Sequence, residues 1–264
     1  MSDFQKKRSR EREKRKKMIV SIIVIWTLFA LAAIAVWRFV VKPMLTNSLI
    51  SVSSEFGQQN ISGLQVGDTL TFGRYEQDNN DANGKEPIEW IILKKKGRSC
   101  LLISRYVLDC QQYQKYYTIT TWESSELRKW LNKDFMSTAF SADEQKLICK
   151  TKVTADANPY FQTEVGNDTK DNIFCLSIVE ANTYFSSDEL RKSAPTDYAI
   201  AQETSAREGY YTTERRATEP WWLRTPGNFK ITAAYVKYDG SIADNGTSVE
   251  SLRFVRPALW INLG

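Results

Sequence analysis

The feature that most constrains this chain is an uncharged, apolar run of 20 residues, 18–37, that directly follows a basic segment. At about 1.5 Å of rise per residue, a helix of that length spans roughly 30 Å, which matches the hydrocarbon core of a bilayer. We therefore predict a transmembrane helix over residues 18–41.

The charges on the two sides of this run predict its orientation. Residues 1–17 contain nine lysines and arginines, whereas only Arg38 and Lys42 follow closely on the other side. Because the more cationic flank stays in the cytoplasm, we expect a cytoplasmic tail at 1–17 and a type II, single-pass plasma-membrane protein with an extracellular C-terminal domain. The motif Ala33-Ile34-Ala35 leaves a cleaved signal peptide open as an alternative.

The net charge of +5 comes from the tail. Residues 1–17 carry a net +6, which leaves the remaining residues near −1. A nearly neutral exported part has no electrostatic footprint for nucleic acid, so we expect no nucleic-acid partner there. The tail itself is expected to lie on anionic lipid, with partner or nucleic-acid binding in the cytoplasm as the alternative.

Beyond the apolar run, the composition predicts a stalk and one globular domain. Residues 42–64 begin with the helix-breaking Pro43 and are rich in serine, asparagine and glutamine, as expected of a stalk. Residues 65–264 are long enough to bury a sizeable core.

Local patterns within the domain predict mixed strands and short helices, an α+β fold. β-rich runs predict strands at 69–75, 88–93, 100–104, 233–238 and 254–261, with a hairpin turn at 95–98 and a turn at Asp239-Gly240. Apolar spacing predicts a helix around 127–131, and the pairs Ser141/Glu144 and Ser177/Glu180 predict capping boxes for two more. The polar stretches 156–172 and 204–219 predict long loops of the kind that often bind ligands.

The chain contains no histidine. This excludes histidine-activated serine or cysteine nucleophiles and removes the usual metal ligand. An enzyme could still use carboxylates or a cysteine, and Glu86 with Glu89 is the carboxylate pair that a glycosidase interpretation would use.

The cysteines and one acidic loop leave two questions open. The four cysteines lack the spacing of a zinc site, so they are either buried thiols or disulfide partners. They are Cys100, Cys110, Cys149 and Cys175. Residues 79–84 imitate the first half of a calcium loop, but a plain turn at Asn83-Gly84 explains them as well. We predict no metal and no cofactor.

Aromatic and arginine residues gather in the last quarter of the chain, and two interpretations stand. In one, the tryptophans and arginines organise the core, and the arginines find carbonyls or carboxylates such as Asp239 and Asp244. In the other, they form a stacking and hydrogen-bonding surface for a sugar or peptide. The candidate ligand-binding residues are Tyr210, Tyr211, Trp221, Trp222, Arg224, Asp239 and Arg256.

Several segments together carry a resemblance to a known family. They are residues 66–73, 87–90, 127–132, 222–227 and 255–259. With them the chain resembles a domain family of unknown function that occurs in surface and secreted bacterial proteins. That family is distantly similar to the formylglycine-generating-enzyme branch of the C-type-lectin-like fold. The resemblance implies a C-type-lectin-like arrangement of mixed strands and short helices with long loops.

The chain departs from the active members of that branch. The oxidases need a cysteine pair near the C-terminal end, and here no cysteine follows Cys175. The iron-dependent members need histidines. We therefore expect a membrane-anchored, non-catalytic extracytoplasmic module that binds a glycan or a surface protein. The alternatives are a cell-envelope enzyme and a sensor or assembly subunit of a membrane complex.

Overall fold

The computed structural model describes residues 49–51, 63–206 and 217–262. The chain divides into two units, Met1–Leu49 and Ile50–Gly264, and the fold below is that of the second. The predicted tail at 1–17, the predicted span at 18–41 and nearly all of the predicted stalk lie outside the described residues. Tyr210 and Tyr211 lie outside them as well.

A six-stranded sheet combines strands from the beginning of the domain with one from its middle and one from its C-terminal end. Its strands run in the order β1 (Leu49–Ser51), β2 (Thr69–Tyr75), β3 (Glu86–Lys96), β4 (Ser99–Ser104), β13 (Ala258–Asn262) and β8 (Ile173–Phe174). The predicted strand at 69–75 and the predicted hairpin of β3 and β4 are confirmed. Alternate residues Ile88, Trp90 and Ile92 are fully buried, as expected when one face of a strand meets the core.

A five-stranded sheet forms from the C-terminal part of the chain. Its order is β11 (Ile242–Ser248), β10 (Thr232–Val236), β9 (Trp221–Pro226), β12 (Leu252–Val255) and β5 (Asp109–Gln112). The predicted turn at Asp239-Gly240 joins β10 to β11, with Gly240 at a φ of 85°. A short pair, β6 (Thr151–Val153) and β7 (Thr169–Asp171), completes the strands.

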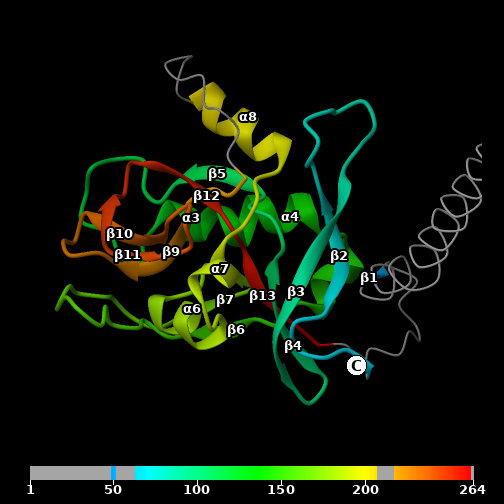
Figure 1. Cartoon of the computed structure of the whole chain (residues 1–264), viewed down its shortest axis with the longest axis horizontal. Helices are drawn as coiled ribbons and strands as arrows, with labels where there is room; N and C mark the ends of the chain where they lie inside the picture. The colour runs from blue at the N-terminus through cyan, green and yellow to red at the C-terminus, as the bar shows by residue number, and fades with distance from the viewer. Residues whose placement is uncertain (1–48, 52–62, 207–216, 263–264) are drawn as a thin grey trace, which may run out of the picture. The chain divides into compact units, whose positions relative to one another are not determined.

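Two segments pass together from one sheet to the other. β4 and β13 pair in the six-stranded sheet, while the strands next to them in sequence, β5 and β12, pair in the five-stranded sheet. Figure 1 shows β12 and β13 as consecutive red ribbons. The predicted single strand at 254–261 is therefore wrong: Arg256 and Pro257 interrupt it where the chain changes sheets.

The helices are short. They are α3 (Glu126–Trp130), the π-helical turn η3 (Leu131–Phe135), α4 (Met136–Ala139), α5 (Ala142–Leu147), α6 (Ile178–Tyr184), α7 (Asp188–Arg191) and α8 (Asp197–Ala206). Both predicted capping boxes are confirmed: the Ser141 and Ser177 side chains each cap a helix, and Glu144 and Glu180 bond back to them. Local hydrogen bonding fixes these helix starts.

The predicted fold class needs correction. We expected an α+β, C-type-lectin-like domain preceded by a transmembrane helix, but the described chain is mostly β, with two large sheets and short helices. The apolar periodicity that predicted helices lasts only a few residues in each case, whereas the β-rich runs extend into full sheets. Among the helices of the described residues, none is both long enough and apolar enough to cross a membrane.

Candidate functional site

The two tryptophans of the predicted ligand surface lie in the core. Trp221 and Trp222 have no exposed surface. The indole N–H of Trp221 donates to the carbonyl oxygen of Arg191 (3.1 Å), and that of Trp222 donates to the carbonyl oxygen of Gln111 (2.9 Å). With both faces and the polar edge occupied, these rings present nothing to a ligand in this structure.

Arg224 is also buried, and its charge is balanced inside the protein. Its guanidinium pairs with Asp156 (2.9 Å) and with Glu180, and it donates to the carbonyl oxygen of Cys175 (3.1 Å). It therefore ties β9 to helix α6 and to the loop that contains Asp156. The core interpretation accounts for these contacts fully.

Arg256 lies where the chain changes sheets, 1% exposed. It donates to the carbonyl oxygens of Ser104 (2.9 Å) and Arg191 (3.0 Å), and its guanidinium carbon lies 5.2 Å from the ring centroid of Trp221. Burial lowers the pKa of Arg256, but these carbonyls and the ring face favour the cation. The suggested partners Asp239 and Asp244 are wrong for both arginines.

Asp239 is exposed in the turn after β10. Its carboxylate accepts from the hydroxyl of Ser241 (2.7 Å), a hydrogen bond that lowers the pKa of Asp239. The structure thus does not bring Asp239 together with the buried arginines and tryptophans.

A different region of the domain forms a groove of about 1060 Å³. Its walls come from the end of β5, the helix α3–η3, the segment before β6, and β7. We call it the basic groove. Its lining residues are Gln111, Gln112, Lys115, Glu126, Leu127, Arg128, Lys129, Trp130, Asn132, Lys133, Asp134, Lys150, Lys170, Asp171 and Asn172.

A buried carboxylate, Asp171, joins the walls of the basic groove. The Arg128 guanidinium donates to its Oδ1 (2.7 Å), while the Trp122 indole N–H (2.9 Å) and the Thr169 hydroxyl (2.6 Å) donate to its Oδ2. Asp171 is 1% exposed. Because three donors satisfy the carboxylate, it holds α3 against β7 and is not free for chemistry.

Asn132, also a lining residue, forms a second connection between the walls of the groove. Its amide oxygen accepts from the backbone N–H of Asn172 (2.7 Å), and its amide nitrogen donates to the carbonyl oxygen of Ile173 (2.8 Å). Asn132 lies in the π-helical turn η3. Such turns are rare and are frequent at functional sites, and this one carries three groove residues, Asn132, Lys133 and Asp134.

The side chains left for a ligand are lysines, amides and one aromatic ring. Lys115, Lys129, Lys133, Lys150 and Lys170 are exposed. Trp130 is partly exposed and packs against Phe135 with a centroid distance of 5.5 Å. An aromatic face beside amides and cations can stack on and hydrogen-bond a polar ligand.

The sequence predicted little of this groove. Its helical segment 127–132 was singled out for its resemblance to the family and for its apolar spacing, not as a binding surface. The lysines are scattered from position 115 to position 170, with no recognisable motif. No signal in the sequence distinguishes them, because the segments that carry them meet only in the folded domain.

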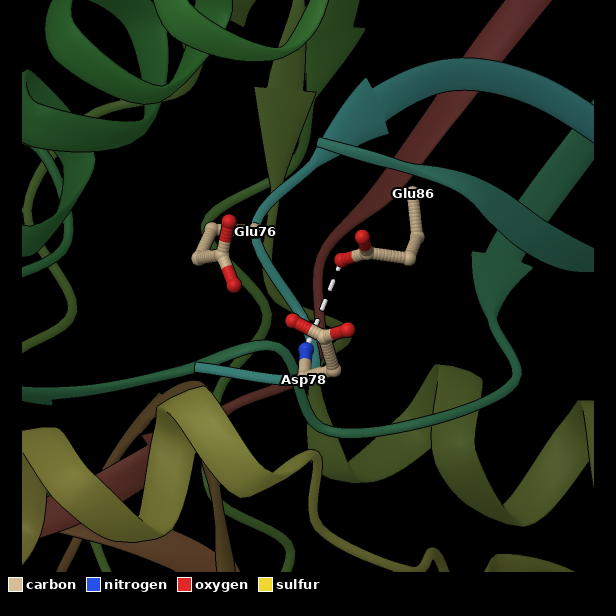
Figure 2. A group of neighbouring side chains, drawn as sticks. All are labelled: Glu76, Asp78 and Glu86. Atoms are coloured by element: carbon tan, nitrogen blue, oxygen red, sulfur yellow. Dashed lines mark hydrogen bonds between the residues drawn. The ribbon is translucent and has the colours of Figure 1, made fainter. Parts of the chain in front are cut away.

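A second cluster consists of the carboxylates of Glu76, Asp78 and Glu86, whose nearest oxygens lie within 4.8 Å of one another. Figure 2 shows the three side chains converging between β2 and β3. The loop after β2 is the segment that imitates a calcium loop in sequence, but the converging carboxylates are not those of the ligand-like positions of that imitation, Asn79, Asp81 and Asn83. Oxygen ligands of this type suit a hard cation such as calcium.

Neighbouring groups shift the pKa of the Glu76 carboxylate. The backbone N–H of Asn80 (2.8 Å) favours the charged form and lowers its pKa, but desolvation together with the charges of Glu86 and Asp78 outweighs this. The net result is a raised pKa for Glu76. Repulsion of this kind is relieved by a proton or by a cation.

The carboxylate pair of the glycosidase interpretation is not arranged as that chemistry needs. Glu86 and Glu89 are three residues apart on β3, so they point to opposite faces of the strand. Glu89 pairs with Arg105 (2.9 Å), and Glu86 accepts from the backbone N–H of Gln77 (2.8 Å).

All four cysteines are free thiols. Cys100, Cys110 and Cys175 are buried, and Cys149 is partly exposed. Burial raises the pKa of the Cys175 thiol to about 12, so the reactive thiolate is strongly disfavoured.

These features define a mostly β domain with a ligand-sized, lysine-rich groove. The chain belongs to the family DUF6273, a domain of unknown function, whose family model matches residues 97–263 and so contains the whole basic groove. The coarser part of the resemblance, to a domain family of unknown function, is thereby confirmed. No curated protein and no solved structure matches the chain.

Proposed function

We propose that the protein is a non-catalytic binding module that recognises a glycan in the basic groove. The observation that carries this proposal is the groove itself, which places the partly exposed ring of Trp130 among amide and ammonium groups. Sugars are bound in this way because an aromatic face covers their C–H surface while amides and charged groups bond their hydroxyls.

The state of the groove residues supports binding rather than chemistry. Asp171 is the buried carboxylate of the lining, and its oxygens are occupied by Arg128, Trp122 and Thr169. The amide side chain of Asn172, by contrast, makes no hydrogen bond within the part of the chain that the structure describes, and it lines the groove. It is available to a ligand hydroxyl.

We place this module outside the cytoplasm, at the cell surface. The support is the charge asymmetry around the apolar run 18–37: nine lysines and arginines lie in residues 1–17, whereas only Arg38 and Lys42 follow the run closely. Protease added to intact cells should remove the C-terminal domain; if it leaves that domain untouched and the amino terminus is found outside, the placement is wrong. The likeness to the formylglycine-generating-enzyme branch stays a hypothesis of ancestry on which the binding proposal does not depend.

Glycan-array screening of the purified full chain tests the binding proposal. We expect binding that is lost in Trp130→Ala and kept in Tyr160→Ala, a matched aromatic control that is 69% exposed and does not line the groove. Silence across the array from a protein that melts normally would contradict the proposal, as would equal loss of binding in both variants.

A surface protein is the second candidate ligand, and exposed apolar loop residues favour it. Tyr116, Tyr117 and Ile119 are each at least 60% exposed, and Phe229 is 62% exposed. The two loops are joined by the backbone N–H of Thr120, which donates to the carbonyl oxygen of Lys230 (2.9 Å). Capture of a protein that is lost in Ile119→Asp but kept in Trp130→Ala would favour this candidate over the glycan.

A further inference from the structure

We infer that the ligand of the basic groove is an anionic polysaccharide rather than a neutral one. This inference rests on the proposed function and adds the chemical class of the glycan. It starts from the five exposed lysines of the lining and from what surrounds them.

The first step is the charge that the groove leaves unbalanced. Among the described residues, no ion pair involves Lys115, Lys129, Lys133, Lys150 or Lys170. The lining also holds Arg128 and three carboxylates, but Arg128 and Asp171 neutralise each other. Five cations then face Glu126 and Asp134, and the groove keeps a positive excess.

Carboxylates elsewhere on the surface do pair with lysines. Lys146 pairs with Asp143 (2.8 Å), Lys152 with Asp168 (2.8 Å) and Lys230 with Glu164 (2.6 Å). The residues after position 17 carry a net charge near −1. The positive groove is therefore a local arrangement and does not follow from a basic composition.

The lysines reach the groove from separate segments. Lys129 and Lys133 are one helical turn apart on α3 and η3, whereas Lys150 precedes β6 and Lys170 lies in β7. The hydrogen bonds of Asp171 and Asn132 join the helical segment to β7, and β7 pairs with β6, which Lys150 precedes. Lysines adjacent in sequence would be solvated side chains that imply no ligand. Here lysines from separate segments converge through tertiary contacts, which concentrates positive electrostatic potential in a concave site.

The extent of the charge favours a polymer over a small anion. Lys115 stands at the β5 side, and its ammonium lies 5.6 Å from the ring centroid of Tyr116, which is 60% exposed. The cations and the Trp130 ring thus span several elements of a groove of about 1060 Å³, with the Tyr116 ring next to Lys115. A chain of sugars with repeated negative groups can meet the lysines in turn while its rings stack on Trp130.

Binding to paired probes of the same backbone tests this inference. The full chain is titrated with polygalacturonate and with its methyl-esterified form, and with dextran sulfate and dextran. We expect the charged member of each pair to bind, with an affinity that falls as salt is added, because salt screens exposed charges. The neutral members should bind at least about tenfold more weakly.

The double variant Lys129→Glu/Lys133→Glu should lose at least about tenfold in affinity for the charged probes. The matched control is Lys94→Glu/Lys96→Glu, two exposed lysines on β3 outside the groove, which should bind as the unchanged protein does. Because all four lysines are exposed, thermal melting should be unchanged in both. Equal loss in both double variants would overturn the assignment to the groove.

The outcomes distinguish a failure of the anionic-ligand inference from a failure of the proposed glycan-binding function. Equal binding of charged and neutral probes overturns the anionic ligand and leaves glycan binding standing. Failure of every polysaccharide to bind a well-folded chain overturns both. Tighter binding of a single-stranded oligonucleotide than of either charged polysaccharide overturns the polysaccharide in favour of a general polyanion site.

Discussion

The guanidinium of Arg128 donates its Nε–H to Oδ1 of Asp171 at 2.7 Å, which joins helix α3 to strand β7 across the basic groove. The side chain of Asp171 is fully buried, while that of Arg128 is 24% exposed. Asp171 therefore stabilises the interior of the domain, whereas Arg128 reaches the surface where a ligand is proposed to bind.

We predict that Asp171→Ala destabilises the domain by about 3–5 kcal/mol, because it leaves Arg128, Trp122 and Thr169 without their shared acceptor. Chemical denaturation measures this. The control Asp143→Ala removes an ion pair with Lys146 that is exposed on both sides, and it should leave stability nearly unchanged. Equal effects of the two substitutions would mean that Asp171 is not the buried connection described.

We predict that Arg256→Ala costs about 3–5 kcal/mol of unfolding free energy, since it empties the space between Trp221 and Phe185 and frees the carbonyls of Ser104 and Arg191. Thermal and denaturant melting provide the measurement. Arg253→Ala is the control, because Arg253 is only partly buried. An unchanged melting temperature in Arg256→Ala would show that the residue is exposed in solution.

We predict that Glu76→Gln stabilises the domain at neutral pH. The pKa of Glu76 is raised in the folded protein relative to its ordinary value of 4.5, so the folded state binds the proton more tightly than the unfolded state does. The stability cost of the charge is therefore largest above the folded pKa and disappears as pH falls below 4.5. Melting curves across pH should show the advantage of Glu76→Gln shrinking on acidification.

Calcium provides the companion measurement for the same cluster. If Glu76, Asp78 and Glu86 hold a cation, added calcium should raise the melting temperature of the unchanged protein more than that of Glu76→Gln. An equal response in both would show that the carboxylates do not bind it.

We predict that the thiols differ in reactivity. Cys149 is partly exposed and should be alkylated first, whereas Cys175 is fully buried with a pKa raised to about 12 and should react only after unfolding. Mass spectrometry after timed alkylation measures the order. Failure of the unfolded, unreduced protein to take up four labels would indicate a disulfide.

The elements that sequence reasoning predicted well are those whose hydrogen bonds close within a few residues. The capping boxes at Ser141 and Ser177 involve partners three residues away, and the turn at Gly240 needs a φ that glycine adopts readily. The strand at 69–75 was predicted from its β-rich composition, which is also a local property.

The candidate site was not of this kind. Trp222 and Arg224 in sequence suit a ligand surface as well as a core, and only the packing of β9 between β10 and β12 decides that they are buried. The basic groove depends on residues from 111 to 172 that meet through Asp171 and Asn132. No local pattern encodes those contacts.

The sequence by itself determined where the helices begin, where the chain turns and how its charge is divided between the tail and the rest. The tertiary structure alone decided which aromatic rings are buried, which lysines share a groove and which carboxylates converge. The physical reason is that caps and turns depend on neighbours along the chain, whereas burial and local potential depend on segments that come together only when the sheets form.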